Sequence, residues 1–170
     1  MGFVGRIYDE LYFRYCQRAA PTPESVESLR PYPDAATVVQ EACKWLASVS
    51  SEPFFLWLHF MDAHAPYYPP NDALQAVNGR PLTPSQARYA NSYWNRSDLS
   101  RERLETRREE ITSMYDAGIR WVDEQVRQLV SFLQDLQYWK RSAFVFTADH
   151  GLRRGGHLFG HRRLRSRSSN

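Results

Sequence analysis

The 170-residue sequence predicts an α/β fold in which a mostly parallel sheet is flanked by helices. Residues 53–60 and 143–147 are short apolar runs, the pattern that is typical of buried strands in such a sheet. A long stretch with helical spacing separates the two runs, and no hairpin signal lies between them. Strand, helix and strand in this order form a crossover unit with two parallel strands. Both runs should therefore end at the same edge of the sheet.

A first helix is expected before residue 50. Asp34 follows a proline-rich loop and is a good N-cap residue. Behind it, apolar residues recur at steps of three and four as far as Val49, which predicts an amphipathic helix packed on the sheet. Cys43 lies inside this helix and is interpreted as a small packing residue.

The region between the two apolar runs contains a connection and a second helix. Residues 71–95 are polar and interrupted by proline and glycine, which predicts an irregular surface connection that shapes a substrate entrance. Ser97 or Asp98 can then cap a long helix, because apolar residues recur at helical spacing from Leu104 to Leu136.

Polar side chains that can carry chemistry follow both apolar runs. Asp149 and His150 come directly after the second run, and Gly151 allows the backbone to turn away. A carboxylate beside an imidazole suits a divalent cation, although the same residues often form a simple turn. After the first run, Asp62 is interpreted as a cap of the turn that precedes His64. His59, within the run, is interpreted as a packed residue.

Three segments together resemble the sulfatase family of the alkaline phosphatase superfamily. They are Met-Asp-Ala-His-Ala-Pro-Tyr-Tyr-Pro-Pro at 61–70, the helical segment 115–126, and Phe-Thr-Ala-Asp-His-Gly at 146–151. They occur in the order and at the separations of that family, over roughly residues 18–151. The resemblance implies a middle fragment of an N-terminal catalytic domain, part of an alkaline phosphatase-like sandwich.

The resemblance also implies roles for individual residues. Asp149 and His150 match the later metal-ligand pair, for which calcium (Ca2+) is the expected ion, and His64 matches a catalytic histidine on the substrate side. A divalent ion lowers the cost of charge on sulfate oxygens, and an imidazole can protonate the departing oxygen. The implied substrate is a small-molecule or glycan sulfate ester.

Two parts of the family's site are absent from the sequence. The family's nucleophile is a formylglycine made from a Cys or Ser in a Cys-x-Pro-x-Arg segment, and neither Cys16 nor Cys43 lies in such a segment. No Asp-Asp pair is present to supply further metal carboxylates. The metal site is therefore expected to be a half-site, and the chain alone is expected to be inactive.

Other functions remain open at this stage. Within the superfamily, a phosphodiesterase, a phosphonate hydrolase or a phosphoethanolamine transferase would share the metal frame and differ in the nucleophile. A non-catalytic remnant that keeps the fold without the chemistry is the alternative from a different class.

The charge distribution divides the chain in two. Six arginines and no acidic residue follow Gly151, whereas the rest of the chain is mildly acidic. We therefore expect a partial sulfatase-type catalytic domain at 1–151 and a basic, disordered tail at 152–170, and a nucleic-acid-binding domain is excluded by charge. No apolar run approaches the ~20 residues of a membrane helix, and no secretory signal is visible, so the sequence leaves the localisation open.

Overall fold

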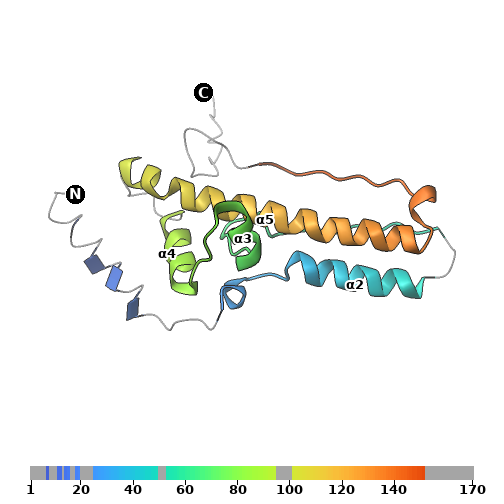
Figure 1. Ribbon diagram of the computed structural model, residues 1–170, viewed down its shortest axis with the longest axis horizontal. Helices are drawn as coiled ribbons and strands as arrows, with labels where there is room; N and C mark the ends of the chain where they lie inside the picture. Colours follow the sequence, from blue (N-terminus) through green and yellow to red (C-terminus); the bar gives the residue numbers. More distant parts are fainter. Residues whose placement is uncertain are drawn as a thin grey trace, which may run out of the picture.

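The structure is a computed structural model, and it describes residues 25–49, 53–94 and 101–151 together with seven isolated positions between residues 7 and 19. All regular secondary structure in these residues is helical (Figure 1). The elements are η1 (Glu27–Leu29), α2 (Ala35–Ser48), α3 (Asn71–Asn78), α4 (Pro84–Trp94), α5 (Arg101–Asp135) and η2 (Trp139–Arg141). The predicted tail at 152–170 lies outside the described residues.

The predicted α/β fold with a mostly parallel sheet is wrong for the part of the chain that the structure describes. Residues 53–61 and 142–148 are extended, as expected for strands, but neither belongs to a β-ladder. A strand becomes part of a sheet only when its backbone groups pair with a neighbouring strand. Here each extended segment runs along a helix without pairing with the other.

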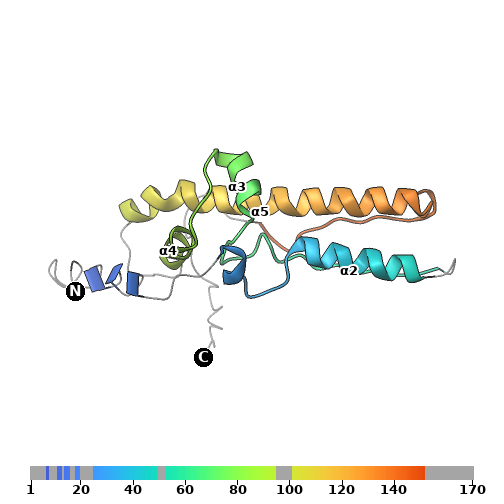
Figure 2. The ribbon, with the colours of Figure 1, turned by 60° about the horizontal axis from the view of Figure 1, so that its bottom comes forward.

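The two longest helices lie side by side and run in the same direction (Figures 1 and 2). Each is followed by an extended segment that returns along the molecule, residues 53–60 after α2 and residues 142–150 after α5. Both returning segments therefore run toward the same part of the molecule, and each ends in one of the two polar motifs.

Helix α2 begins where the sequence predicts it. The Asp34 carboxylate accepts hydrogen bonds from the backbone N–H of Thr37 at 2.9 Å and from its hydroxyl at 2.6 Å, as an N-cap does. The apolar face of α2 packs against α5 in one core cluster, against which Cys43 is partly buried, as predicted. The buried members of this cluster are Val39, Ala42, Leu46, Leu129 and Leu133.

The first extended segment covers this cluster with every second side chain. Phe54, Leu56, Leu58 and Phe60 pack against it. The intervening side chains point away, and Phe55 and Trp57 are 84% and 70% exposed. A period of two is the pattern of a strand with one covered face, so this segment keeps the local geometry of a strand. His59 lies on the exposed face, which contradicts its interpretation as a packed residue.

The prediction of an irregular connection at 71–95 is wrong, because two helices form there. Pro70 is the N-cap of α3 and Pro84 is the first residue of α4. Gly79 ends α3 with a φ of 73°, a left-handed conformation that glycine adopts without strain. The two prolines and the glycine of this segment therefore mark helix ends.

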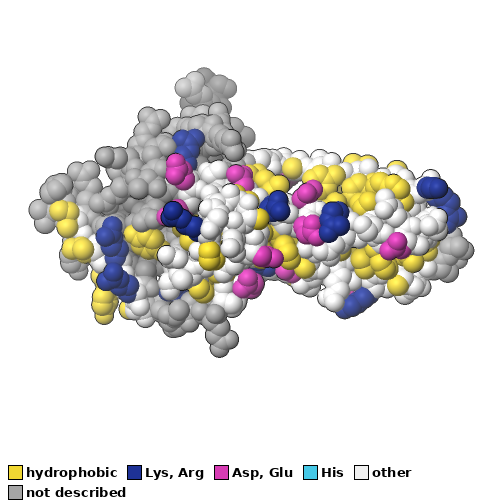
Figure 3. Space-filling view, viewed as in Figure 1, with side chains coloured by type: hydrophobic (Ala, Val, Ile, Leu, Met, Phe, Trp, Pro, Cys, Tyr) yellow, Lys and Arg dark blue, Asp and Glu magenta, His cyan; other side chains and the backbone are white. Residues whose placement is uncertain are grey.

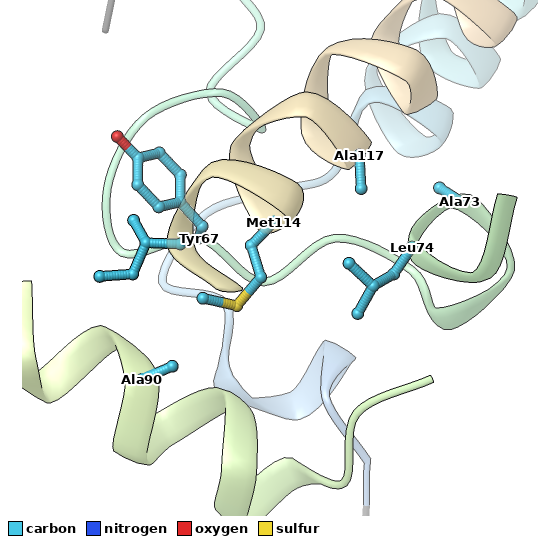
Figure 4. Packing of buried hydrophobic residues seen from close by; sticks show 7 residues of the cluster. Tyr67, Ala73, Leu74, Ala90, Met114 and Ala117 are labelled. Atoms are coloured by element: carbon cyan, nitrogen blue, oxygen red, sulfur yellow. The ribbon is translucent and has the colours of Figure 1, made fainter. Parts of the chain in front are cut away.

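A second core cluster lies where α3 and α4 pack on α5. Met114 is fully buried at its centre, and Figure 4 shows its side chain among Tyr67, Leu74 and Ala90. Tyr67 comes from the segment that follows His64, so this cluster connects the first polar motif to the helices.

The long helix that the sequence predicts is confirmed as α5, although its expected caps, Ser97 and Asp98, lie outside the described residues. None of the helices in the described ranges is both long and apolar enough to cross a membrane.

Candidate functional site

His64 lies in a turn directly after the first extended segment. Its backbone N–H donates to the carbonyl of Met61 at 2.9 Å, and its side chain is exposed. The imidazole Nδ1 lies 2.6 Å from the carbonyl oxygen of Ala65. A carbonyl oxygen only accepts, so Nδ1 carries a proton and the second ring nitrogen, Nε2, is left available.

Asp62 connects this turn to the start of α2. Its carboxylate is 5% exposed, and Oδ1 accepts a hydrogen bond from the backbone N–H of Ala35 at 3.2 Å. The sequence interpretation placed this carboxylate on its own turn, whereas this bond joins it to the first residue of the helix. Oδ2 is buried and has no partner among the described residues. Burial therefore raises the pKa of Asp62, although the Ala35 hydrogen bond and the charge of Arg30 oppose the rise.

Two side chains from the segment before α2 hold the backbone that follows His64. The Arg30 guanidinium donates from Nε to the carbonyl of Tyr68 at 2.7 Å and from Nη1 to Asp34 at 3.1 Å. The Tyr32 hydroxyl lies 2.9 Å from the carbonyl of His64 and 3.1 Å from that of Pro66. Burial, followed by the negative charge of Asp62, raises the pKa of Tyr32 to about 12, so this hydroxyl stays protonated and donates.

A third side chain reaches the same backbone from α4. Asn91 is 3% exposed, and its Oδ1 accepts from the backbone N–H of Tyr67 at 2.6 Å. Its Nδ2 donates to the carbonyl of Tyr67 at 2.7 Å and to that of Ala87 at 2.9 Å. The sequence analysis missed Arg30, Tyr32 and Asn91, and their neighbours in the sequence carry no signal that could have revealed them.

The second polar motif is far more exposed. The side chains of Asp149 and His150 are 82% and 69% exposed. Asp149 Oδ1 accepts from the backbone N–H of His150 at 2.7 Å, and Asp149 Oδ2 lies 3.6 Å from His150 Nε2. These contacts are local, which is the geometry of the simple turn that the sequence analysis kept as an alternative.

Both motifs lie beside α5 residues that are within one helical turn of each other. A Cβ atom at Gly118 would lie 2.5 Å from the carbonyl oxygen of Asp62, so the turn before His64 touches the helix backbone. A Cβ atom at Gly151 would lie 3.9 Å from the hydroxyl of Tyr115. The ring of Tyr115 also packs edge-on against that of Tyr67, with the centroids 5.6 Å apart. No hydrogen bond or ion pair in the described ranges joins His64 to Asp149 or His150.

The donors that the structure brings together do not fit a calcium site. Calcium takes six to eight oxygen ligands, whereas Asp149 contributes one carboxylate and His150 one imidazole. Among the described residues, no group of three or more His, Cys, Asp or Glu side chains could hold a metal ion. No step of a reaction is therefore assigned to a metal at this site.

Comparison with known proteins adds one finding. A family model described as Sulfatase matches residues 2–168, which is nearly the whole chain and includes both polar motifs. No curated protein and no solved structure matches the chain.

Proposed function

The chain belongs to the sulfatase family, and we propose that it supplies the His64 part of a site that hydrolyses sulfate esters. Members of this family generally use a divalent metal and a formylglycine nucleophile and act on sulfate esters. The proposed substrate is a small-molecule or glycan sulfate ester. The proposed role of His64 is catalytic, and that of Asp149 and His150 is to contribute two of the donors to a divalent metal.

One observation supports this proposal: the two motifs, 85 to 86 residues apart in the sequence, lie beside α5 residues that are one turn apart. Asp62 lies against the helix backbone at Gly118, and Gly151 lies near the side-chain hydroxyl of Tyr115. A site that needs both a proton donor and metal donors requires them at the same end of the fold. The course of the two returning segments along α5 (Figure 1) supports this proposal, although the segments do not pair.

The chemistry assigned to His64 is general-acid catalysis. Hydrolysis of a sulfate ester breaks the bond between sulfur and the ester oxygen, and that oxygen leaves as an anion unless it receives a proton. A protonated His64 would keep its Nδ1–H on the carbonyl of Ala65 and transfer the Nε2 proton to the departing oxygen. The neutral imidazole that remains has the tautomer described above.

Turnover by the isolated chain is not expected, because its sequence contains no Cys-x-Pro-x-Arg segment and no Asp-Asp pair. We propose that hydrolysis requires both. The check is an assay of the purified chain with p-nitrophenyl sulfate in the presence of calcium. Turnover that disappears in His64→Ala would contradict the proposed inactivity while supporting the role of His64.

The role of His64 itself can be tested by titration. The imidazole signals of the chain, labelled with 15N and 13C at histidine, are followed while p-nitrophenyl sulfate is added. We expect the His64 signal to shift and the signal of His59, an exposed histidine on the returning segment, to stay in place. A titration that leaves His64 unchanged would contradict the assignment. A larger shift with p-nitrophenyl phosphate would favour the phosphoryl-transfer branch of the superfamily.

A further inference from the structure

We propose that Asn91 is a positioning residue for His64. It holds residues 64–68 in one conformation and thereby fixes which imidazole nitrogen is available. The catalytic role of His64 rests on the proposed function, but the positioning can be tested without substrate. This gives helix α4 a role in the site.

Asn91 pairs both backbone groups of Tyr67 with its carboxamide. One oxygen accepts from the Tyr67 N–H and one nitrogen donates to the Tyr67 carbonyl, so both polar groups of a single residue are paired by one side chain. The second donor of the nitrogen is used on the Ala87 carbonyl within α4. Because Asn91 is buried, removing its side chain leaves buried backbone groups of Tyr67 without these bonds.

Arg30 and Tyr32, which precede the loop in the sequence, bind the same loop that Asn91 binds from the segment after it. Tyr32 reaches the carbonyls of His64 and Pro66, and Arg30 reaches the carbonyl of Tyr68. With Asn91 on Tyr67, side chains from two distant segments pair the backbone at four of the five residues 64–68. The loop cannot change its backbone conformation without breaking several of these bonds.

The remaining residue of the loop, Ala65, supplies the acceptor for the imidazole. Its carbonyl oxygen lies 2.6 Å from His64 Nδ1. The tautomer of a histidine is set by the hydrogen bond that its other ring nitrogen makes. When the loop is held, this acceptor stays in place, Nδ1 keeps the proton, and Nε2 is the nitrogen that meets the solvent.

The test compares two neighbouring substitutions in α4 of the full chain. Asn91→Ala removes the two hydrogen bonds to the backbone of Tyr67. Ala90→Gly, at a buried position in the same helix turn, weakens the helix but keeps the Asn91 side chain that binds Tyr67. The readout is the 15N shift pattern of the His64 ring, which reports the tautomer, together with the exchange rate of the Tyr67 amide. The His64 signal is assigned with His64→Gln.

We expect wild type and Ala90→Gly to show His64 with its proton on Nδ1, and Asn91→Ala to lose this signature. Amide exchange at Tyr67 should become about tenfold faster in Asn91→Ala, the effect of losing one buried hydrogen bond. The inference is overturned if folded Asn91→Ala keeps the wild-type His64 pattern, or if Ala90→Gly changes it equally.

A second variant covers the case in which Asn91→Ala does not fold. Tyr32→Phe removes one hydroxyl, and with it the bonds to the carbonyls of His64 and Pro66. The 15N pattern of the His64 ring in this variant should also lose the signature of a proton on Nδ1. If Asn91→Ala does not fold, an unchanged His64 pattern in Tyr32→Phe would overturn the inference. These measurements use no substrate. The positioning of His64 by Asn91 can therefore be supported even if the titration with p-nitrophenyl sulfate contradicts the proposed function.

Discussion

The two extended segments of the molecule are both apolar runs followed by a polar motif, but their environments are opposite. Residues 53–60 cover a core cluster with every second side chain, and the loop that follows is held by side chains from two other segments. Residues 142–150 are exposed throughout, although the Phe144 ring lies 5.8 Å from that of Trp139. Figure 3 shows apolar side chains gathered at the surface on the half of the molecule where the second segment returns along α5.

The two halves of the proposed site therefore depend on the rest of the chain to different degrees. His64 is placed by residues of this chain, through hydrogen bonds that bridge 24 to 38 positions of the sequence. Asp149 and His150 are placed by their own turn. The isolated chain should therefore report on the first half of the site and show little response in the second.

The largest difference in stability is expected between alanine substitutions at two glycines. Gly118→Ala should lower the free energy of unfolding by about 3 kcal/mol, because the new methyl group would overlap the carbonyl oxygen of Asp62 and force the turn off α5. Gly151→Ala meets only the Tyr115 hydroxyl, at an ordinary contact distance of 3.9 Å, and should change it by less than about 0.5 kcal/mol. Urea denaturation of both variants measures the contrast. Equal losses would show that the second segment is anchored as firmly as the first.

A smaller contrast is expected within the extended segments themselves. Leu56→Ala should cost about 2 kcal/mol, because the side chain packs against the cluster between α2 and α5. Val145→Ala should cost less than about 0.5 kcal/mol, because Val145 is 84% exposed. Thermal unfolding followed by circular dichroism gives both values. A Val145→Ala loss as large as that of Leu56→Ala would mean that the second segment is covered in solution.

The buried carboxyl of the first segment should also make stability depend on pH. Burial raises the pKa of Asp62 above its ordinary value of 3.8, so the folded state holds this proton more tightly than the unfolded state. Wild-type stability therefore falls as pH rises through the folded pKa of Asp62. Asp62→Asn lacks this loss, so it should gain stability relative to wild type as pH rises above about 4, until Asp62 is ionised in folded wild type. At pH 7 it should lie within about 1 kcal/mol of wild type.

Asp34 provides the matched control for this pH experiment, because its contribution has the opposite sign. Burial acts to raise the pKa of Asp34, but hydrogen bonds from Thr37 and Arg30 outweigh it and the pKa is lowered below 3.8. The stability that Asp34 contributes is present above pH 3.8 and is lost as pH falls through its folded pKa. Urea midpoints of Asp34→Asn and Asp62→Asn should therefore diverge from wild type in different pH windows. A flat difference between Asp62→Asn and wild type would contradict the burial of Asp62.

The smallest effect is expected from calcium. One carboxylate and one imidazole leave most of the calcium coordination sphere unfilled, so binding weaker than about 1 mM is expected. Adding calcium at 1 mM should then stabilise the chain by less than about 0.5 kcal/mol, and Asp149→Ala should not change this result. Calorimetry that shows micromolar affinity would mean that further donors complete the site.

The helices could be predicted from the sequence to the extent that their signals are local. Asp34 as a cap and the apolar spacing within α2 and α5 were sufficient for those two helices. Helices α3 and α4 were missed because Pro70, Gly79 and Pro84 were interpreted as interruptions, whereas they occupy helix ends. The sheet was predicted wrongly because strand pairing depends on distant partners, which an apolar run does not specify.

The candidate site divides in the same way. His64, Asp149 and His150 were identified from short motifs, and their roles stay predictions. The residues that hold the His64 loop could not be identified, because a buried Asn in an amphipathic helix looks like any surface Asn until the fold brings Tyr67 beside it. Their function comes from tertiary contact and not from local spacing.

The exposed second segment has a consequence for how the protein behaves at high concentration. Phe144, Val145 and Phe146 present an extended backbone and large apolar groups to solvent, which is a template for self-association between copies. Charged residues lie on both sides of this stretch, with Lys140 and Arg141 before it and Asp149 after it. When copies pair in parallel and in register, like charges face each other and repel, so added salt, which screens them, should favour this mode of association.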